Sequence, residues 1–176
     1  MLARLAALGI ESRTHSHPAL HTVEEAQAWR RAASAEAPDA LAGGHCKNLF
    51  LKDKKGRLYL LVALEEDPVR IQQVAKAIGA ARLSFGKPDL MEATLGVTPG
   101  SVTPFALIND RERAVTVVLS SAMLAQPLLH FHPLTNTRTT AITPAGLNRF
   151  IEACGHTPVP LNLSDLGSAD DREDTS

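Results

Sequence analysis

One lysine interrupts a run of apolar residues that is otherwise typical of a buried strand. Residues 45–56 predict a strand that leads into a turn, and Lys47 lies within the apolar part at residues 46–51. Lysine is almost never fully buried unless it is paired or has a task. In a partly dry pocket its ammonium group would interact strongly with a carbonyl oxygen or a phosphate, because the effective dielectric is low there. On spacing alone, an edge-strand lysine with its head in water is an equally good interpretation.

A second candidate is the loop at residues 96–104, which contains two glycines and two prolines. These residues fix the backbone and permit close approach by a ligand. The amides of Gly100 and Ser101 could therefore stabilise a developing oxyanion. The alternative is a rigid turn that links a helix to a strand.

Histidines occur in two pairs, His15 with His17 and His130 with His132, each on one side of an extended segment. A zinc site usually needs a third or fourth ligand at a recognisable spacing, so we expect no metal. We expect His15 and His17 on the surface. One of His130 and His132 shares a face with core residues, where a hydrogen-bonded core histidine is the default.

The sequence offers no covalent nucleophile and no cofactor motif. There is no G-x-S-x-G elbow, and Cys46 and His45, as neighbours on a strand, point to opposite faces. The phosphate-binding and dinucleotide fingerprints are absent as well, so we expect no cofactor. With no signal peptide expected at the N-terminus, we interpret Cys46 and Cys154 as reduced thiols of a cytoplasmic protein.

The composition is that of a soluble globular chain of 176 residues, with 44% hydrophobic and 21% charged residues. No apolar run approaches the ~20 residues that would cross a bilayer, so we expect no membrane contact. Without the five acidic residues and one arginine of residues 165–176, the balance changes from 18 basic and 19 acidic residues to 17 and 14. Lys52, Lys54 and Lys55, with Arg57, can contact phosphate locally, but they are too few for a broad nucleic-acid groove.

The elements that would position these residues follow from apolar periodicity and from capping residues. Helices are predicted at residues 2–8, from a capping box at Thr22 and Glu25 to about residue 33, from an N-cap at Asp67 to residue 78, at 88–95, and from 143 to 154. Strands are predicted at residues 46–51, 58–64, 105–108, 114–119, 128–134 and 138–142, with a hairpin turn at 53–56. Residues 34–44 predict a loop.

Strands and helices alternate, but tight turns join several strand pairs. The pattern predicts an α/β fold with one domain, in which a mixed and partly barrel-like sheet is flanked by helices. We expect that domain at residues 1–163 and a disordered acidic tail at 164–176.

Three motifs occur in a fixed order: Lys-Asn-Leu-Phe-Leu at residues 47–51, Gly-Val-Thr-Pro-Gly-Ser-Val-Thr-Pro at 96–104, and Phe-His-Pro-Leu-Thr-Asn-Thr at 131–137. Together with His17-Pro18 and residues 22–26, they closely resemble the YbaK/ProX family of free-standing aminoacyl-tRNA deacylases. That family is related to the insertion editing domain of bacterial prolyl-tRNA synthetase. The resemblance covers residues 10–152, and the first and third motifs look most like the ProX branch, which clears alanyl-tRNA(Pro).

The resemblance implies hydrolysis of the ester that joins a wrong amino acid to tRNA(Pro). It places Lys47 near the terminal adenosine and the ester, Gly96 and Gly100 along the site, and His132 beside the amino-acid pocket. Candidate substrate-binding residues in the matching motifs are also Asn48, Thr135 and Asn136. We expect Lys47, Gly100 and Ser101 to act on the ester, and Lys52, Lys54 and Lys55 to bind tRNA.

Because the ester is already activated, neither a metal nor a strong nucleophile is required. The expected reaction is deacylation of alanyl-tRNA(Pro) in translation proofreading, with prolyl-tRNA synthetase as a candidate partner. The alternatives are the same chemistry on tRNA(Pro) carrying 2-aminobutyrate, serine or cysteine, and a non-catalytic module that binds tRNA or the synthetase. A metal-dependent hydrolase is a third alternative.

Overall fold

An eight-stranded mixed sheet runs through the computed structural model, which describes residues 1–19, 23–36 and 42–167. Its path is β1-β7-β6-β2-β3-β5-β8, and β4 pairs with β2 beside this path. The strands are β1 (Ser12–Ser16), β2 (Gly44–Asp53), β3 (Leu58–Leu64), β4 (Leu83–Phe85), β5 (Val115–Ser120), β6 (Leu129–Phe131), β7 (Arg138–Ile142) and β8 (Val159–Leu161). Since β1 and β8 end the path, the sheet is not closed. The predicted α/β fold with a mixed sheet is confirmed.

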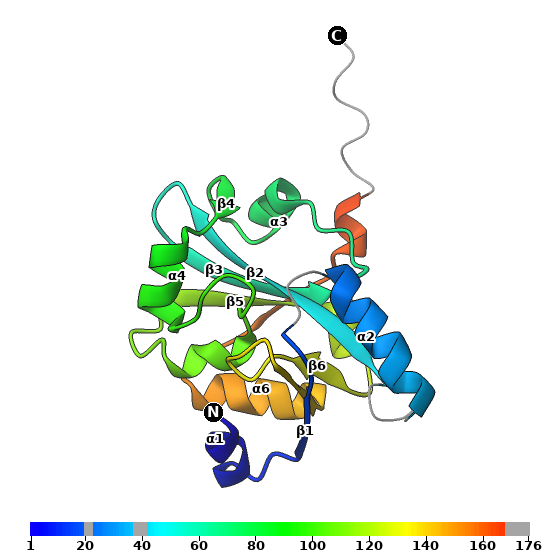
Figure 1. Ribbon diagram of the computed structural model, residues 1–176. Helices are drawn as coiled ribbons and strands as arrows, with labels where there is room; N and C mark the ends of the chain where they lie inside the picture. Colours follow the sequence, from blue (N-terminus) through cyan, green and yellow to red (C-terminus); the bar gives the residue numbers. More distant parts are fainter. Residues whose placement is uncertain (20–22, 37–41, 168–176) are drawn as a thin grey trace.

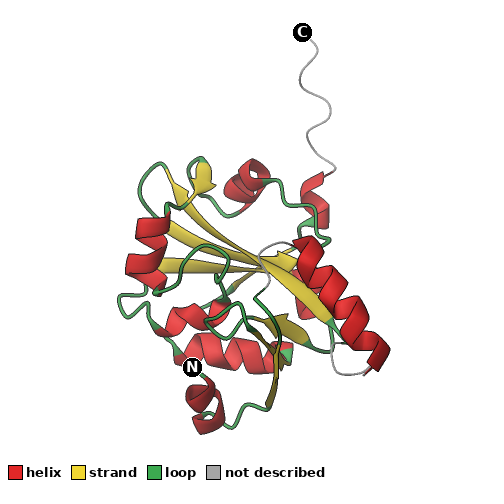
Figure 2. Ribbon diagram, in the orientation of Figure 1, coloured by secondary structure: helices red, strands yellow, loops and turns green. Residues whose placement is uncertain are grey.

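Helices cover both faces of the sheet (Figure 2). The helices are α1 (Leu2–Ala7), α2 (Val23–Glu36), α3 (Ile71–Ala77), α4 (Pro88–Leu95), α5 (Ser121–Leu124) and α6 (Pro144–Ala153), with 3-10 turns η1 (Pro104–Ile108) and η2 (Ser164–Gly167). Among them, no described helix is both long and apolar enough to pass through a bilayer.

Strand β2 contributes to two separate cores because its side chains alternate between the two faces. Phe50 belongs to the larger core, whose centre is Phe105, with ring centroids 5.4 Å from Phe150 and 5.8 Å from Phe131. Leu51 belongs to the smaller core beneath α3 and η2. These two layers fix the strand from both sides.

Strand β2 also pairs with three other strands, and the lengths of these pairings differ. It pairs with β3 from Cys46 to Lys52, and with β4 at its last three residues. With β6 it shares a parallel pairing at Gly44 and His45 alone. Beyond His45 the strands β2 and β6 diverge, and this divergence positions the candidate site described below.

Several predicted elements are confirmed at their predicted bounds. Pro88–Leu95 is a helix that ends at Gly96 in the left-handed conformation, and Arg138–Ile142 is a strand. Pro at the first helical turn and Gly just past the last one are strong local signals, which explains this agreement.

Two predictions are wrong. Residues 105–108 form η1 instead of a strand, because Pro104 opens a helical turn and Thr103 caps it by accepting from the Phe105 amide. Asp67 is not the N-cap of α3, which begins after Arg70. Its carboxylate instead accepts from the Leu64 amide at 3.1 Å and from the Ser120 hydroxyl at 2.7 Å.

The C-terminal segment continues beyond the predicted end of the domain. Residues 164–167 form η2, and Leu166 packs against the smaller core. The rest of the predicted tail, residues 168–176, lies outside the described residues, as does Thr22 of the predicted capping box.

Candidate functional site

A pocket with an empty volume of about 480 Å³ lies where β2 leaves β6. Its lining residues come from α2, from β2, from the ends of β3 and β6, and from β7: Ala26, Trp29, Arg30, His45, Cys46, Asn48, Glu65, His130, Phe131, His132 and Thr139. Two of the sequence-predicted substrate-binding residues, Asn48 and His132, are in this set. The pocket therefore brings the first and third sequence motifs together.

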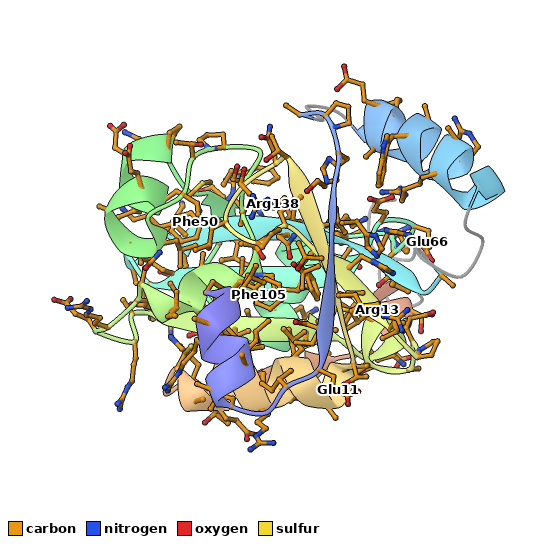
Figure 3. The ribbon with its side chains drawn as sticks, turned by 60° about the horizontal axis from the view of Figure 1, so that its bottom comes forward. Glu11, Arg13, Phe50, Glu66, Phe105 and Arg138 are labelled. Carbon is orange, nitrogen blue, oxygen red and sulfur yellow. The ribbon has the colours of Figure 1, made fainter. Side chains whose placement is uncertain are left out.

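An ion pair holds α2 over this pocket. Arg30 of α2 donates from both terminal nitrogens to the two carboxylate oxygens of Glu65, at 3.1 and 2.6 Å. Arginine and carboxylate in this fork geometry fix orientation as well as distance. Figure 3 shows Glu66, the next residue, beside the start of β2 near α2, whereas Phe50 lies toward the other end of the strand.

Two histidines of the pocket have defined proton positions because each bonds to a backbone carbonyl, which can only accept. His130 donates from Nε2 to Ala42 at 3.0 Å, and His132 donates from Nδ1 to Arg138 at 3.0 Å. Burial lowers the pKa of both imidazoles. Both rings are therefore neutral at pH 7, and each has an acceptor nitrogen remaining, Nδ1 of His130 and Nε2 of His132.

The prediction that His17 lies on the surface is wrong. His17 is buried, its Nε2 accepts from the Thr139 hydroxyl at 2.9 Å, and its ring lies 4.8 Å from that of Trp29 and 5.9 Å from that of His132. It supports the wall that Trp29 and His132 form. His15 is half-buried.

Two buried polar atoms of the pocket residues have no hydrogen-bond partner among the described residues: Oδ1 of Asn48 and Nδ1 of His130. The ring of His130 stacks on that of His45, with centroids 4.6 Å apart. A buried polar atom without a partner costs free energy, ~1–3 kcal/mol. Both atoms are acceptors, so a ligand that donates hydrogen bonds would recover this cost.

Lys47 is half-buried, and its ammonium group is hydrogen-bonded within the protein. It donates to the backbone carbonyls of Glu65, at 3.0 Å, and of Asp67. Lys47 is not itself among the residues that line the pocket, although Glu65 is. A lysine ammonium has three donors, and these carbonyls take two of them. One N–H therefore remains. Lys47 pairs with Ala63 of the smaller core, so its side chain leaves β2 on the face opposite to Asn48, and its contact with the ester stays a prediction.

The loop at residues 96–104 lies outside the pocket lining. Gly96 ends α4 with φ of 64°, and a Cβ there would lie 2.9 Å from the Asn109 side chain. Gly100 is exposed with φ of 88°. The Ser101 amide donates to the Thr98 carbonyl at 3.0 Å, so it would have to give up this bond to bind an oxyanion. The proposed clamp stays a prediction.

Thr135 and Asn136 lie in the turn between β6 and β7, and the Thr135 hydroxyl bonds to that of Thr137 at 3.0 Å. Neither lines the pocket. Their predicted role in substrate binding stays a prediction, and what the structure adds is that their turn joins His132 to Arg138, the two residues linked by a hydrogen bond.

At the other end of β2, the basic turn of Lys52, Lys54 and Lys55 is organised by Asp53. Its carboxylate accepts from the amides of Lys55 and Arg57 and, at 2.7 Å, from Nε of Arg57. Burial alone would raise the pKa of Asp53, but these hydrogen bonds lower it to about 2. The three lysines are exposed around this fixed carboxylate.

Two further kinds of chemistry are a metal site and a cysteine nucleophile. In the part of the chain that the structure describes, no three His, Cys, Asp or Glu residues are grouped to hold a metal ion. Cys46 lines the pocket, but burial raises the pKa of its thiol. A thiolate nucleophile is therefore disfavoured at neutral pH.

No pattern in the sequence indicated five of the pocket residues: Trp29, Arg30, Glu65, Phe131 and Thr139. Arg30 and Glu65 are opposite charges 35 positions apart, on a helix and just past a strand. No local pattern links them. Residues 131–137 form one of the three sequence motifs. Which side chains of this motif face the pocket depends on how β6 pairs with β2 and β7.

Comparison with known proteins identifies the family of this chain. Residues 17–150 match the family model of the aminoacyl-tRNA editing domain. The chain is 39% identical over 161 residues to "Prolyl-tRNA synthetase associated domain-containing protein 1" of Danio rerio, covering 90% of this chain and 83% of that protein. It is 30% identical over 164 residues to "Prolyl-tRNA editing protein ProX" of Acetoanaerobium sticklandii, covering 93% and 95%.

The fold is shared with a solved structure described as "a putative trans-editing enzyme for prolyl tRNA synthetase", with a TM-score of 0.66 and 20% identity over 91% of this chain and 92% of that one. The resemblance drawn from the three motifs is confirmed. The chain belongs to the aminoacyl-tRNA editing family, the deacylases that remove wrong amino acids from tRNA.

Proposed function

We propose that this deacylase edits tRNA(Pro), and that its preferred substrate is alanyl-tRNA(Pro), which it hydrolyses to alanine and tRNA(Pro). The observation that carries the proposal is the pocket at the β2–β6 divergence, where acceptor atoms of Asn48 and His130 lack partners. The ProX relative and the relatives named for prolyl-tRNA synthetase support tRNA(Pro) as the acceptor.

The chemistry of an aminoacyl ester suits this pocket. The substrate carries an α-ammonium group and a vicinal ribose hydroxyl, both hydrogen-bond donors. Oδ1 of Asn48 accepts from one of these donors. The third N–H of Lys47 holds the ester carbonyl oxygen or the terminal phosphate, where a low dielectric strengthens the contact.

Hydrolysis then needs a positioned water and an oxyanion contact. Water attacks the ester carbonyl carbon, assisted by the ribose hydroxyl and by the acceptor Nε2 of His132. The bond from that carbon to the ribose oxygen breaks, and the proton released by water passes to the ribose oxygen. Lys47, with the Gly100 amide and with the Ser101 amide once it has released the Thr98 carbonyl, stabilises the negative charge that develops on the carbonyl oxygen. No covalent enzyme intermediate is formed.

Selection against prolyl-tRNA comes from exclusion. The pocket walls of Trp29, Phe131 and His132 are packed against other rings, so they do not give way to a larger side chain. Exclusion by overpacking discriminates better than the ~1–3 kcal/mol available from one missing methylene. On this proposal the packed walls admit alanine and exclude the larger proline ring.

Lys52, Lys54 and Lys55 contact the phosphates of the tRNA, and prolyl-tRNA synthetase is the candidate protein partner in the cytoplasm. The division into a domain at residues 1–163 and an acidic tail at 164–176 remains part of the same proposal, except that residues 164–167 form η2. Two alternatives keep the tRNA but change the outcome: preference for tRNA(Pro) carrying 2-aminobutyrate, serine or cysteine, or binding without turnover.

One experiment separates these readings. Purified protein is mixed with tRNA(Pro) charged with alanine, 2-aminobutyrate, serine, cysteine or proline, and the charged fraction is followed in time. The proposal expects the fastest loss from alanyl-tRNA(Pro) and none above background from prolyl-tRNA(Pro). Faster loss from another small residue would transfer the substrate assignment to that residue. Binding of tRNA(Pro) with no deacylation in any arm would contradict the proposal.

A further inference from the structure

A second hollow is lined by residues of the β2–β3 turn, β4 and α4. These elements lie at the far end of β2 (Figure 1). We call this hollow the β4–α4 groove. Lys52, Lys54, Phe85 and Lys87 are among its lining residues.

Phe85 presents its ring to solvent in this groove. It is 63% exposed, the highest value among the large hydrophobic side chains of the described residues. It is also held in place, because Phe85 pairs with Leu51 of β2 and the next amide, of Gly86, donates to the Phe50 carbonyl at 2.9 Å. An aromatic ring fixed in this way on a strand is a surface on which a flat group can stack.

The charges around the ring favour an anion. Lys52, Lys54 and Lys87 are exposed cations of the groove. The carboxylate of Asp53 is buried and already engaged by Arg57. Asp89 is the exposed carboxylate of the lining, so three cations face one anion. Lysines around an exposed ring are typical of sites for single-stranded nucleic acid, where phosphates meet the cations and bases stack.

The groove reaches β2 from both faces: Phe85 pairs with Leu51 and shares its face, whereas Lys52 shares the face of Asn48 in the pocket. Asn48 in the pocket and Lys52 in the groove are four residues apart, and an even spacing places both on the same side of the strand. At 3.3 Å per residue, about 13 Å separates them along β2. A few unpaired nucleotides of a tRNA 3′ end can bridge this distance.

From the exposed ring, the three lysines and the position of Lys52 on the same strand face as Asn48, we propose that the β4–α4 groove binds unpaired nucleotides of the tRNA 3′ end. A base stacks on Phe85 while the terminal aminoacyl-adenosine enters the pocket. This inference rests on the proposed function, since it concerns the same tRNA, and it adds a nucleotide site that the three sequence motifs do not include.

The test compares uncharged tRNA(Pro) with the same tRNA lacking its unpaired 3′ nucleotides. For the wild-type protein, removing these nucleotides weakens binding. Phe85→Ala is expected to weaken binding of the intact tRNA about tenfold, in the range that base stacking on an aromatic side chain provides. The same substitution leaves the affinity for the truncated tRNA unchanged, and Phe85→Trp restores binding of the intact tRNA.

Val159→Ala is the matched control, because Val159 is a 40% exposed apolar residue of β8, outside the groove lining. It changes neither affinity. For charge, Lys87→Ala reduces the salt dependence of log K by about one unit, and Arg149→Ala, an exposed cation of α6, does not.

Equal effects of Phe85→Ala on intact and truncated tRNA, or no effect on either, would overturn the inference. Loss of self-association or of synthetase binding in that variant, with tRNA affinity unchanged, would assign the ring to a protein contact instead. These results leave deacylation by the wild-type protein intact. Failure of the proposed function shows itself separately, as wild-type protein that deacylates no charged tRNA(Pro).

Discussion

The two ends of strand β2 differ in how completely their buried polar groups are hydrogen-bonded. At its beginning, acceptor atoms of Asn48 and His130 are buried without partners, and Lys47 keeps one donor beyond its two carbonyl bonds. At its end, the Asp53 carboxylate is fully engaged by amides and by Arg57, while the lysines beside it lie in solvent. Incomplete hydrogen bonding in a buried pocket indicates a place where a ligand completes the structure. Complete hydrogen bonding beneath exposed cations indicates a rigid platform for long-range charge contacts.

The largest effect is expected at Lys47. Lys47→Ala removes the ammonium group that we propose contacts the ester, and it should lower the single-turnover rate of alanyl-tRNA(Pro) deacylation about 10²–10³-fold, as loss of one electrostatic contact to an oxyanion does. Because Lys47 also holds the carbonyls of Glu65 and Asp67, thermal unfolding of the variant is measured alongside. Lys47→Ala that folds normally and retains the full rate would make the assignment of Lys47 wrong.

The next effect concerns how the deacylation rate depends on pH below neutrality. Since burial lowers the pKa of His132, this imidazole stays neutral, with Nε2 as an acceptor, to a pH below the ordinary value of ~6.5. The rate kcat/KM for alanyl-tRNA(Pro), corrected for spontaneous hydrolysis, should therefore decline only below that pH.

His132→Gln cannot titrate in this range and should both slow the reaction and remove the acid limb. A limb above pH 6.5, or the same limb in His132→Gln, would show that another group controls it.

A smaller effect concerns stability at the other end of the strand. The pKa of Asp53 is lowered to about 2 in the folded protein, below its ordinary ~3.9. The ionised carboxylate therefore stabilises the fold above pH ~3.9, and this contribution is lost as the pH falls through the folded-state pKa. Asp53→Asn should lower the melting temperature at pH 7, and its difference from wild type should shrink between pH 4 and pH 2. A pH-independent difference would contradict the role of the charge.

The smallest effects belong to the lysines of the basic turn. Lys52→Ala, Lys54→Ala and Lys55→Ala should each weaken tRNA(Pro) binding modestly and reduce the slope of log K against log salt by about one. Titrations at several salt concentrations measure this slope, and Lys76→Ala, an exposed cation of α3, serves as the control. Unchanged slopes in the three variants would remove these residues from the tRNA contact.

Features that depend on local sequence could be predicted, whereas features that depend on contacts between distant residues could not. The helix Pro88–Leu95 and the strand Arg138–Ile142 were predicted at their observed bounds because capping residues and turns mark them locally. Asp67 was misassigned because its carboxylate bonds to Ser120, 53 positions away, and no local pattern reports such a contact. Thr103-Pro104 did contain the signal for η1, since threonine is a good cap and proline suits a first turn.

For the site, the sequence identified Asn48 and His132, which lie on strands with recognisable motifs. It did not identify Trp29, Arg30 or Glu65, because their meeting depends on how α2 crosses the sheet. The proton positions of His130 and His132 were equally out of reach, since they follow from carbonyl partners that folding brings to the rings.

The most direct test compares one substitution at each end of β2 on the same face. Single-turnover deacylation of alanyl-tRNA(Pro) is measured at saturating enzyme for Asn48→Ala and for Lys52→Ala, so that differences in tRNA affinity do not affect the rate. We predict that Asn48→Ala lowers the rate about tenfold or more, as expected when a ~1.4 kcal/mol contact to the reacting group is lost, while Lys52→Ala reacts at the wild-type rate. A normal rate for Asn48→Ala, or an equal loss in Lys52→Ala, would contradict the assignment of the chemistry to the β2–β6 pocket.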